Sequence, residues 1–261
     1  GSPSDAVKNE LIQAAAERRI ISGKSLLMTM AGSAPLSNSL EAVKALRVVA
    51  SPGDIPALLQ ILLGMSDEQA QEEMENTIGA LAQKISDPYS RGKDVEDLLA
   101  PAPDSKSVPV TEISKRCLLY RTLGKIGDDS SLPLVRAALK DQDVQIQDSA
   151  IRALADWPNS TPREDVLGIA QRSQNLTRQV LALRGYIRMV GLEKYQSPEA
   201  AVHSLKTALD LATRPDEKKL VLGALPDFAC PEALALAESF LNVEGLREEA
   251  LAAVEKIKEK I

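Results

Sequence analysis

Apolar residues recur along the chain at the spacing of helix faces. In the clearest unit, residues 113 to 140, a first segment keeps its apolar residues on one face until Gly127 interrupts it. A second segment opens at Ser131-Leu132-Pro133. There the serine is a candidate cap, and the proline sits in the first turn, where its missing N–H costs nothing. The pattern predicts two helices joined by a tight turn.

The same pair of helices recurs before and after this unit. The second helices are marked by a proline near their start, at Pro56, Pro133, Pro162, Pro198 and Pro231. The long interval between Pro56 and Pro133 leaves room for one more pair, expected within residues 66 to 99. Before the fourth pair's second helix, Thr161 and Glu164 have the spacing of a capping box.

These units predict an all-α fold, an α-solenoid or superhelix of stacked helix-turn-helix repeats. We expect a single solenoid over residues 5–261 with about six repeats. Atypical capping helices are expected at 5–31 and 246–261. A proline-rich loop at 100–110 is read as an insertion into a continuous array, because the repeat pattern holds on both sides of it.

Composition narrows the range of partners. Hydrophobic residues make up 44% of the chain and aromatic residues only 3%, which suits close packing of aliphatic helices. The net charge of −6 disfavours nucleic acid, whose readers concentrate positive charge. No apolar run is long enough to insert into a membrane. We expect a monomer that binds no nucleic acid and does not insert into a membrane.

Two stretches carry a family resemblance, Leu123-Gly124-Lys125-Ile126-Gly127-Asp128 and Ala150-Ile151-Arg152-Ala153-Leu154. With the proline-opened second helices and the period of about 30 to 40 residues, they resemble the HEAT repeat, and in particular the short bacterial variety called PBS-lyase-type HEAT-like. The resemblance implies an armadillo-like superhelix and is weak evidence for function.

A narrower resemblance rests on residues 181–188, 214–219 and 222–225. These segments are similar to the HEAT-like region of exported bacterial proteins, several of which also carry a keto-disaccharide hydrolase-type domain. The resemblance implies a periplasmic or extracellular location, with the cytoplasm as the alternative.

Candidate chemistry is sparse. His203 is the single histidine, and it shares a polar helix face with Lys206 and Asp210, so we interpret it as a surface residue. Cys117 and Cys230 have no metal-ligand spacing, and we expect each at a small core or capping position. No phosphate-binding glycine motif occurs. The sequence therefore predicts no catalytic residue, no cofactor and no metal, and the chain is expected not to be an enzyme.

Three further side chains have an ordinary packing interpretation. Trp157 and Tyr186 lie on apolar helix faces and are expected in the core. Arg184 and Arg188 are spaced as a solvated stripe on one helix.

The function expected from these observations is a protein-protein or interdomain scaffold. Its partner would be another protein or a neighbouring domain of the same polypeptide, held on a concave face formed by the second helices. The alternatives are an accessory helical domain of a carbohydrate-processing exported protein, or an enzyme on a HEAT scaffold of the bilin lyase or DNA glycosylase type. The candidate partner-binding residues are Gln60, Arg136, Lys140, Gln171, His203, Lys206 and Asp210. If the other face is used, the corresponding first-helix residues are Lys115, Gln147 and Arg178.

Overall fold

The computed structural model describes residues 10, 12, 23–33, 35–100 and 109–261. Helices dominate the described residues, and no strand occurs among them. The predicted all-α solenoid class is confirmed. The predicted capping helix at 5–31 and the proline-rich loop at 100–110 lie largely outside the described residues.

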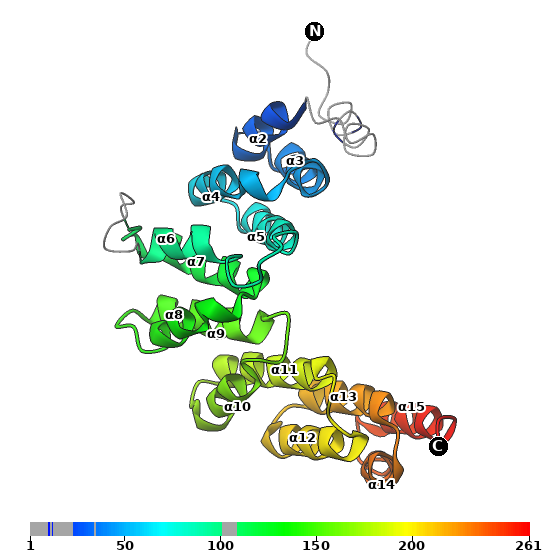
Figure 1. Cartoon of the computed structure of the whole chain (residues 1–261). Helices are drawn as coiled ribbons and strands as arrows, with labels where there is room; N and C mark the ends of the chain where they lie inside the picture. The colour runs from blue at the N-terminus through cyan, green and yellow to red at the C-terminus, as the bar shows by residue number, and fades with distance from the viewer. Residues whose placement is uncertain (1–9, 11, 13–22, 34, 101–108) are drawn as a thin grey trace. The chain divides into compact units, whose positions relative to one another are not determined.

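The chain divides into two compact units, Gly1–Ala153 and Leu154–Ile261. Figure 1 labels the helices of both units in chain order. A single continuous solenoid over 5–261 stays a prediction. The described helices of the first unit are α2 (Lys24–Ser33), α3 (Leu36–Val49), α4 (Ile55–Gly64), α5 (Glu68–Ala82), α6 (Lys93–Leu99), α7 (Ile113–Ile126) and α8 (Leu132–Ala138). The helices of the second unit are α10 (Arg163–Arg172), α11 (Leu176–Leu192), α12 (Pro198–Leu211), α13 (Pro215–Ala224), α14 (Pro231–Glu238) and α15 (Arg247–Lys258). Helix α9 (Val144–Asp156) runs across the boundary.

Within each unit the helices stack in two layers. In the first unit α3, α5 and α7 pack in succession in one layer, and α2, α4 and α6 pack in the other. In the second unit α11, α13 and α15 form one layer, and α12 packs against α14 in the other. In the pairs formed by these helices the first helix thus lies in one layer and the second helix in the other, which is the arrangement of a helical-repeat solenoid.

The proline markers fix where the second helices begin. Pro56, Pro133, Pro198 and Pro231 lie in the first turns of α4, α8, α12 and α14, as the sequence predicts. Pro162 instead occupies the N-cap position of α10. Since proline fixes φ and lacks the N–H that a first turn leaves unbonded, each marker favours a helix start at its position.

One of the predicted caps is wrong. The hydroxyl of Ser131 makes no capping bond to α8; it donates to Oε1 of Glu96. At α10 the N-cap position is occupied by Pro162, and the capping box of Thr161 and Glu164 stays a prediction. Before both helices an Asx side chain accepts an amide of the turn: Oδ1 of Asp128 accepts that of Ser130, and Oδ1 of Asn159 accepts that of Thr161.

Side chains of neighbouring helices close some of the open helix ends. Nε2 of Gln83, just after α5, donates to the carbonyl of Ile126, the last residue of α7, at 2.6 Å. In the second unit a guanidinium nitrogen of Arg188 on α11 donates to the carbonyls of Ala155 and Trp157 at 2.8 and 2.6 Å. The last carbonyls of a helix have no partner inside it, so these bonds satisfy groups that would otherwise need water.

Glycines allow the first helices to approach one another closely. A Cβ placed on Gly124 of α7 would lie 2.6 Å from Cα of Ala153 in α9. A Cβ on Gly79 of α5 would lie 2.8 Å from the carbonyl oxygen of Lys125 in α7. These distances are shorter than a carbon in van der Waals contact permits, so only glycine fits these helix contacts.

Candidate functional site

A groove in the first unit lies where three helices begin and one ends. Its volume is about 400 Å³. It is bounded by the end of α4, the starts of α5 and α7, and Gln145 near the start of α9. The lining residues are Leu63, Met65, Ser66, Glu68, Gln71, Glu112, Ser114, Lys115, Cys117, Leu118, Arg121 and Gln145.

Local hydrogen bonds fix the wall of the groove between α4 and α5. The side chain of Asp67 caps α5 by accepting the amide of Ala70 at 2.9 Å. One turn further along, Nε2 of Gln71 donates to the carbonyl of Met65 at 2.8 Å. These bonds connect the end of α4 to the start of α5. They therefore fix the backbone that carries Met65 and Glu68 beside the groove.

The two cations that line the groove are already paired. Nζ of Lys115 lies 2.7 Å from Oε2 of Glu112, and the hydroxyl of Ser114 donates to Oε1 of the same carboxylate. The guanidinium group of Arg121 contacts Oε1 of Glu75 at 2.8 to 2.9 Å. Burial raises the pKa of Glu75, and the positive charge of Arg121 opposes this shift.

Glu68 is the lining carboxylate without a partner. It is exposed, and no ion pair or hydrogen bond of its side chain occurs within the part of the chain that the structure describes. The apolar lining consists of Leu63 and Met65, which are half-buried, and Leu118 and Cys117, which are buried; we call these four residues the floor of the groove. The groove therefore combines an apolar floor with one unpaired negative charge.

The residues expected to bind a partner all lie on second helices or directly after one, and all are exposed. Gln60, Arg136 and Lys140 belong to the first unit, whereas Gln171, His203, Lys206 and Asp210 belong to the second. Three of the residues in the second unit lie on one face of α12: His203, Lys206 and Asp210. Of the alternative first-helix residues, Lys115 lines the groove. The choice between these surfaces stays a prediction.

Two packing interpretations are confirmed and one is wrong. Trp157 is fully buried and Tyr186 is 3% exposed, so both belong to the core. Arg184 and Arg188 do not form a simple solvated stripe. Arg184 pairs with the buried carboxylate of Glu217 in α13, and Arg188 closes the end of α9. Both arginines have partners in other helices, which the spacing along α11 cannot reveal.

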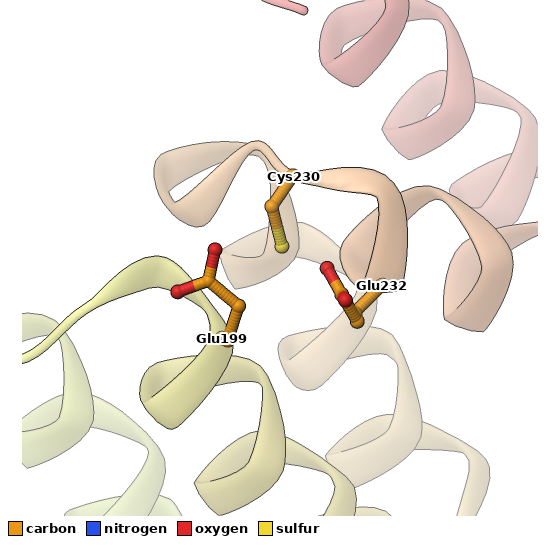
Figure 2. Close-up of side chains that lie close together, drawn as sticks. All are labelled: Glu199, Cys230 and Glu232. Atoms are coloured by element: carbon orange, nitrogen blue, oxygen red, sulfur yellow. The ribbon is translucent and has the colours of Figure 1, made fainter.

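One group of potential metal ligands occurs in the described part of the second unit. Glu199, Cys230 and Glu232 each offer a ligand atom, and these atoms lie within 4.8 Å of one another (Figure 2). Sequence reasoning missed this group because the thiol and Glu199 come from different repeats. The signal that could have found it is the parallel between Ser197-Pro198-Glu199 and Cys230-Pro231-Glu232. Both cysteines are buried and free, and Cys230 caps α14.

None of the described helices is both long enough and apolar enough to cross a membrane.

Comparisons with known proteins yield distant structural likenesses. No family model matches the sequence. No curated protein matches it either. Among solved structures, the chain is similar to the complex of CpcE and CpcF of phycocyanin lyase from Nostoc sp. PCC7120, with a TM-score of 0.45, 15% identity, and coverage of 98% of this chain and 91% of that chain. It is also similar to human deoxyhypusine hydroxylase in complex with glycerol, with a TM-score of 0.41, 14% identity, and coverage of 94% and 99%.

These two structures correct one sequence-based prediction. The chain was expected not to be an enzyme, yet both similar proteins are named as enzymes, a lyase and a hydroxylase. A fold of this kind does not exclude catalysis, because chemistry depends on the site that a fold carries, and the expectation of no activity is withdrawn.

Proposed function

We propose that the chain is an interaction scaffold whose groove in the first unit binds an extended polypeptide segment. The segment belongs to another protein or to a neighbouring domain of the same polypeptide. It presents an apolar side chain to the floor of the groove and a basic side chain to Glu68. The observation that carries this proposal is the combination of an apolar floor and an unpaired carboxylate in one cavity.

The size and lining of the groove support a peptide as its occupant. A cavity of about 400 Å³ admits bulky side chains, and Leu63, Met65 and Leu118 supply apolar area for them. Polar side chains stand around this floor, as is typical of protein interfaces, which have an apolar centre and a polar rim. The side chain of Gln145 is exposed at the rim, where it can bond to a peptide backbone.

Charge favours a basic segment over an acidic one. Lys115 and Arg121 are engaged by Glu112 and Glu75, whereas Glu68 is unpaired. The net charge of the chain, −6, also attracts basic partners during diffusional encounter. An acidic segment would meet the repulsion of Glu68 and would have to displace an existing partner of Lys115 or Arg121.

The proposal is tested with fluorescent peptides of matched length that alternate leucine with lysine, leucine with glutamate, or serine with lysine. We expect the leucine-lysine peptide to bind most tightly in fluorescence anisotropy. In NMR spectra its addition should shift the signals of Leu63, Leu118 and Gln145. The serine-lysine peptide measures attraction by charge alone, and the leucine-glutamate peptide keeps the apolar side chains but reverses the charge.

Matched variants locate the binding surface. E68K should weaken binding of the leucine-lysine peptide about tenfold or more and improve binding of the leucine-glutamate peptide. K140E, on the second-helix side of the same unit, changes charge in the opposite sense and should leave the groove intact. Signal shifts confined to α4 and α8 around Gln60 and Arg136, with no effect of E68K, would contradict the groove and favour the second-helix face.

A further inference from the structure

The start of α12 and the start of α14 present the same three-residue motif. In both, an N-cap residue is followed by proline and then by glutamate: Ser197-Pro198-Glu199 and Cys230-Pro231-Glu232. Oγ of Ser197 accepts the amide of Ala200 at 3.3 Å, and Sγ of Cys230 accepts the amide of Ala233 at 3.4 Å. Oxygen side chains are the preferred helix caps, so capping alone does not explain a sulfur at the second of two otherwise equivalent positions.

The thiol of Cys230 is buried and directed toward the two carboxylates. Cys230 is only 5% exposed, and its side chain extends between Glu199 and Glu232 (Figure 2). Its sulfur accepts one amide, but the S–H has no acceptor within the described residues. The S–H is a weak donor, and a thiolate bound to a cation would leave no unsatisfied donor at this depth.

The carboxylates of Glu199 and Glu232 have no cationic partner. Both are exposed, and neither forms an ion pair with a lysine or arginine of the described chain. Each glutamate in a first turn is explained by the positive end of its helix. That explanation does not account for the convergence of two carboxylates from different helices on one buried thiol.

We propose that Glu199, Cys230 and Glu232 bind a thiophilic divalent cation, with Zn²⁺ as the ion best suited to the ligands. One thiolate and two carboxylate oxygens provide three protein ligands, and a water molecule completes a tetrahedral shell. Binding releases the thiol proton to solvent. A soft sulfur ligand disfavours Mg²⁺ and Ca²⁺, which take oxygen ligands.

The geometry is close to that of a bound ion. With Zn–S and Zn–O bonds of about 2.3 and 2.1 Å, tetrahedral ligand atoms lie about 3.5 Å apart. The three ligand atoms here lie within 4.8 Å of one another, so the exposed glutamates need to move by only about 1 Å through side-chain rotation. The buried sulfur stays in place, and the amide of Ala233 that donates to it stabilises the negative charge of the thiolate.

This inference departs from the prediction of no metal made from the sequence. The test uses the full chain, freed of metal with a chelator and kept reduced, and titrated with Cd²⁺ and Co²⁺. We expect a thiolate-to-cadmium charge-transfer absorption that saturates at one equivalent, and a visible cobalt spectrum of tetrahedral type. Zn²⁺ should abolish both signals by competition, whereas Mg²⁺ and Ca²⁺ should not.

Three variants assign the ligands. C230S should abolish the charge-transfer signal and preserve the helical circular dichroism, because serine caps the equivalent helix at Ser197. C117S removes the other thiol and should leave the signal unchanged. The exposed double variant E199Q/E232Q should weaken cadmium binding at least tenfold without affecting the fold.

The proposal is overturned if the reduced wild-type chain gives no signal at stoichiometric cadmium. It is also overturned if the signal depends on Cys117 and not on Cys230, or if E199Q/E232Q binds cadmium as tightly as the wild type. Should C230S lose its helical signal, the double glutamine variant alone decides the outcome.

Discussion

Arg121 of α7 donates from Nε to Oε1 of Glu75 in α5 at 2.9 Å, and a second guanidinium nitrogen lies 2.8 Å from the same oxygen. Arg184 of α11 repeats these distances with Oε1 of Glu217 in α13. The side chains of the two glutamates are only 2% and 1% exposed. Each unit therefore contains a buried carboxylate that is held by an arginine of the adjacent first helix.

Removing Arg121 should destabilise the first unit. In R121M the carboxylate of Glu75 loses its partner while it remains buried, which costs about 3 kcal/mol in fully buried pairs. We expect about 2 kcal/mol, because the Arg121 side chain is 26% exposed and solvent screens part of the interaction. Urea unfolding measures the change. K44M, which breaks the exposed pair with Glu41, is the matched control and should change stability by less than about 0.5 kcal/mol.

The same carboxylate should make stability depend on pH. Burial raises the pKa of Glu75, so the folded chain holds this proton at a pH where the unfolded chain has lost it. The free energy of unfolding contributed by Glu75 therefore falls as pH rises from the ordinary glutamate pKa through the raised one. Unfolding of wild type and E75Q across this range should show a difference that shifts in favour of E75Q with rising pH. A difference that shifts the other way would mean that Arg121 lowers the pKa of Glu75.

A methyl group at the helix contact of Gly124 should be costly. In G124A the new carbon would lie 2.6 Å from Cα of Ala153, so α7 and α9 must separate, and overpacking of this kind costs about 1 to 3 kcal/mol. G223A is the control, because nothing lies within 4 Å of a Cβ at that exposed position in α13. Alanine there should raise stability by about 0.5 kcal/mol through its helix propensity. Thermal melts of the two variants should move in opposite directions.

Charge reversal on the second helices should leave the fold unchanged. Lys140 and Lys206 are exposed, and K140E and K206E should each change stability by less than about 0.5 kcal/mol. If the second-helix face binds the partner, these variants lose binding while E68K retains it. If the groove binds the partner, the opposite pattern is expected. Tighter binding by both K140E and K206E together with weaker binding by E68K would indicate that net charge, and not a particular surface, governs association with a basic partner.

The sequence predicts the helices well because their signals are local. A proline in the first turn indicates where a helix begins, and the periodic apolar positions indicate which face is buried. Both signals come from residues close together in the sequence. The caps are predicted less well. Ser131 has the right residue type, but its hydroxyl bonds to Glu96, and Asp128 upstream accepts an amide of the turn. A cap cannot be assigned from its residue type alone when a competing side chain lies two or three positions earlier.

Contacts between repeats could not be predicted from one sequence. Arg184 and Arg188 have the spacing of a solvated stripe, and only the packing of α11 against its neighbours supplies Glu217 and the carbonyls of α9 as their partners. The groove arises in the same way, from helix ends brought together by stacking. The positions that line it carry no pattern along the chain, because each helix contributes only a few of them.

At two places in the chain, a side chain of a neighbouring repeat donates a hydrogen bond to the carbonyls at the end of a helix. Gln83 satisfies the final carbonyl of α7, and Arg188 satisfies those at the end of α9. When one repeat unfolds, its side-chain donor no longer bonds to the helix-end carbonyls of the neighbouring repeat. Those carbonyls then lack a hydrogen-bond partner in the protein. Deleting a terminal pair of helices is therefore expected to lower hydrogen-exchange protection beyond the cut, and the stack behaves as a chain of mutually dependent units instead of a row of independent ones.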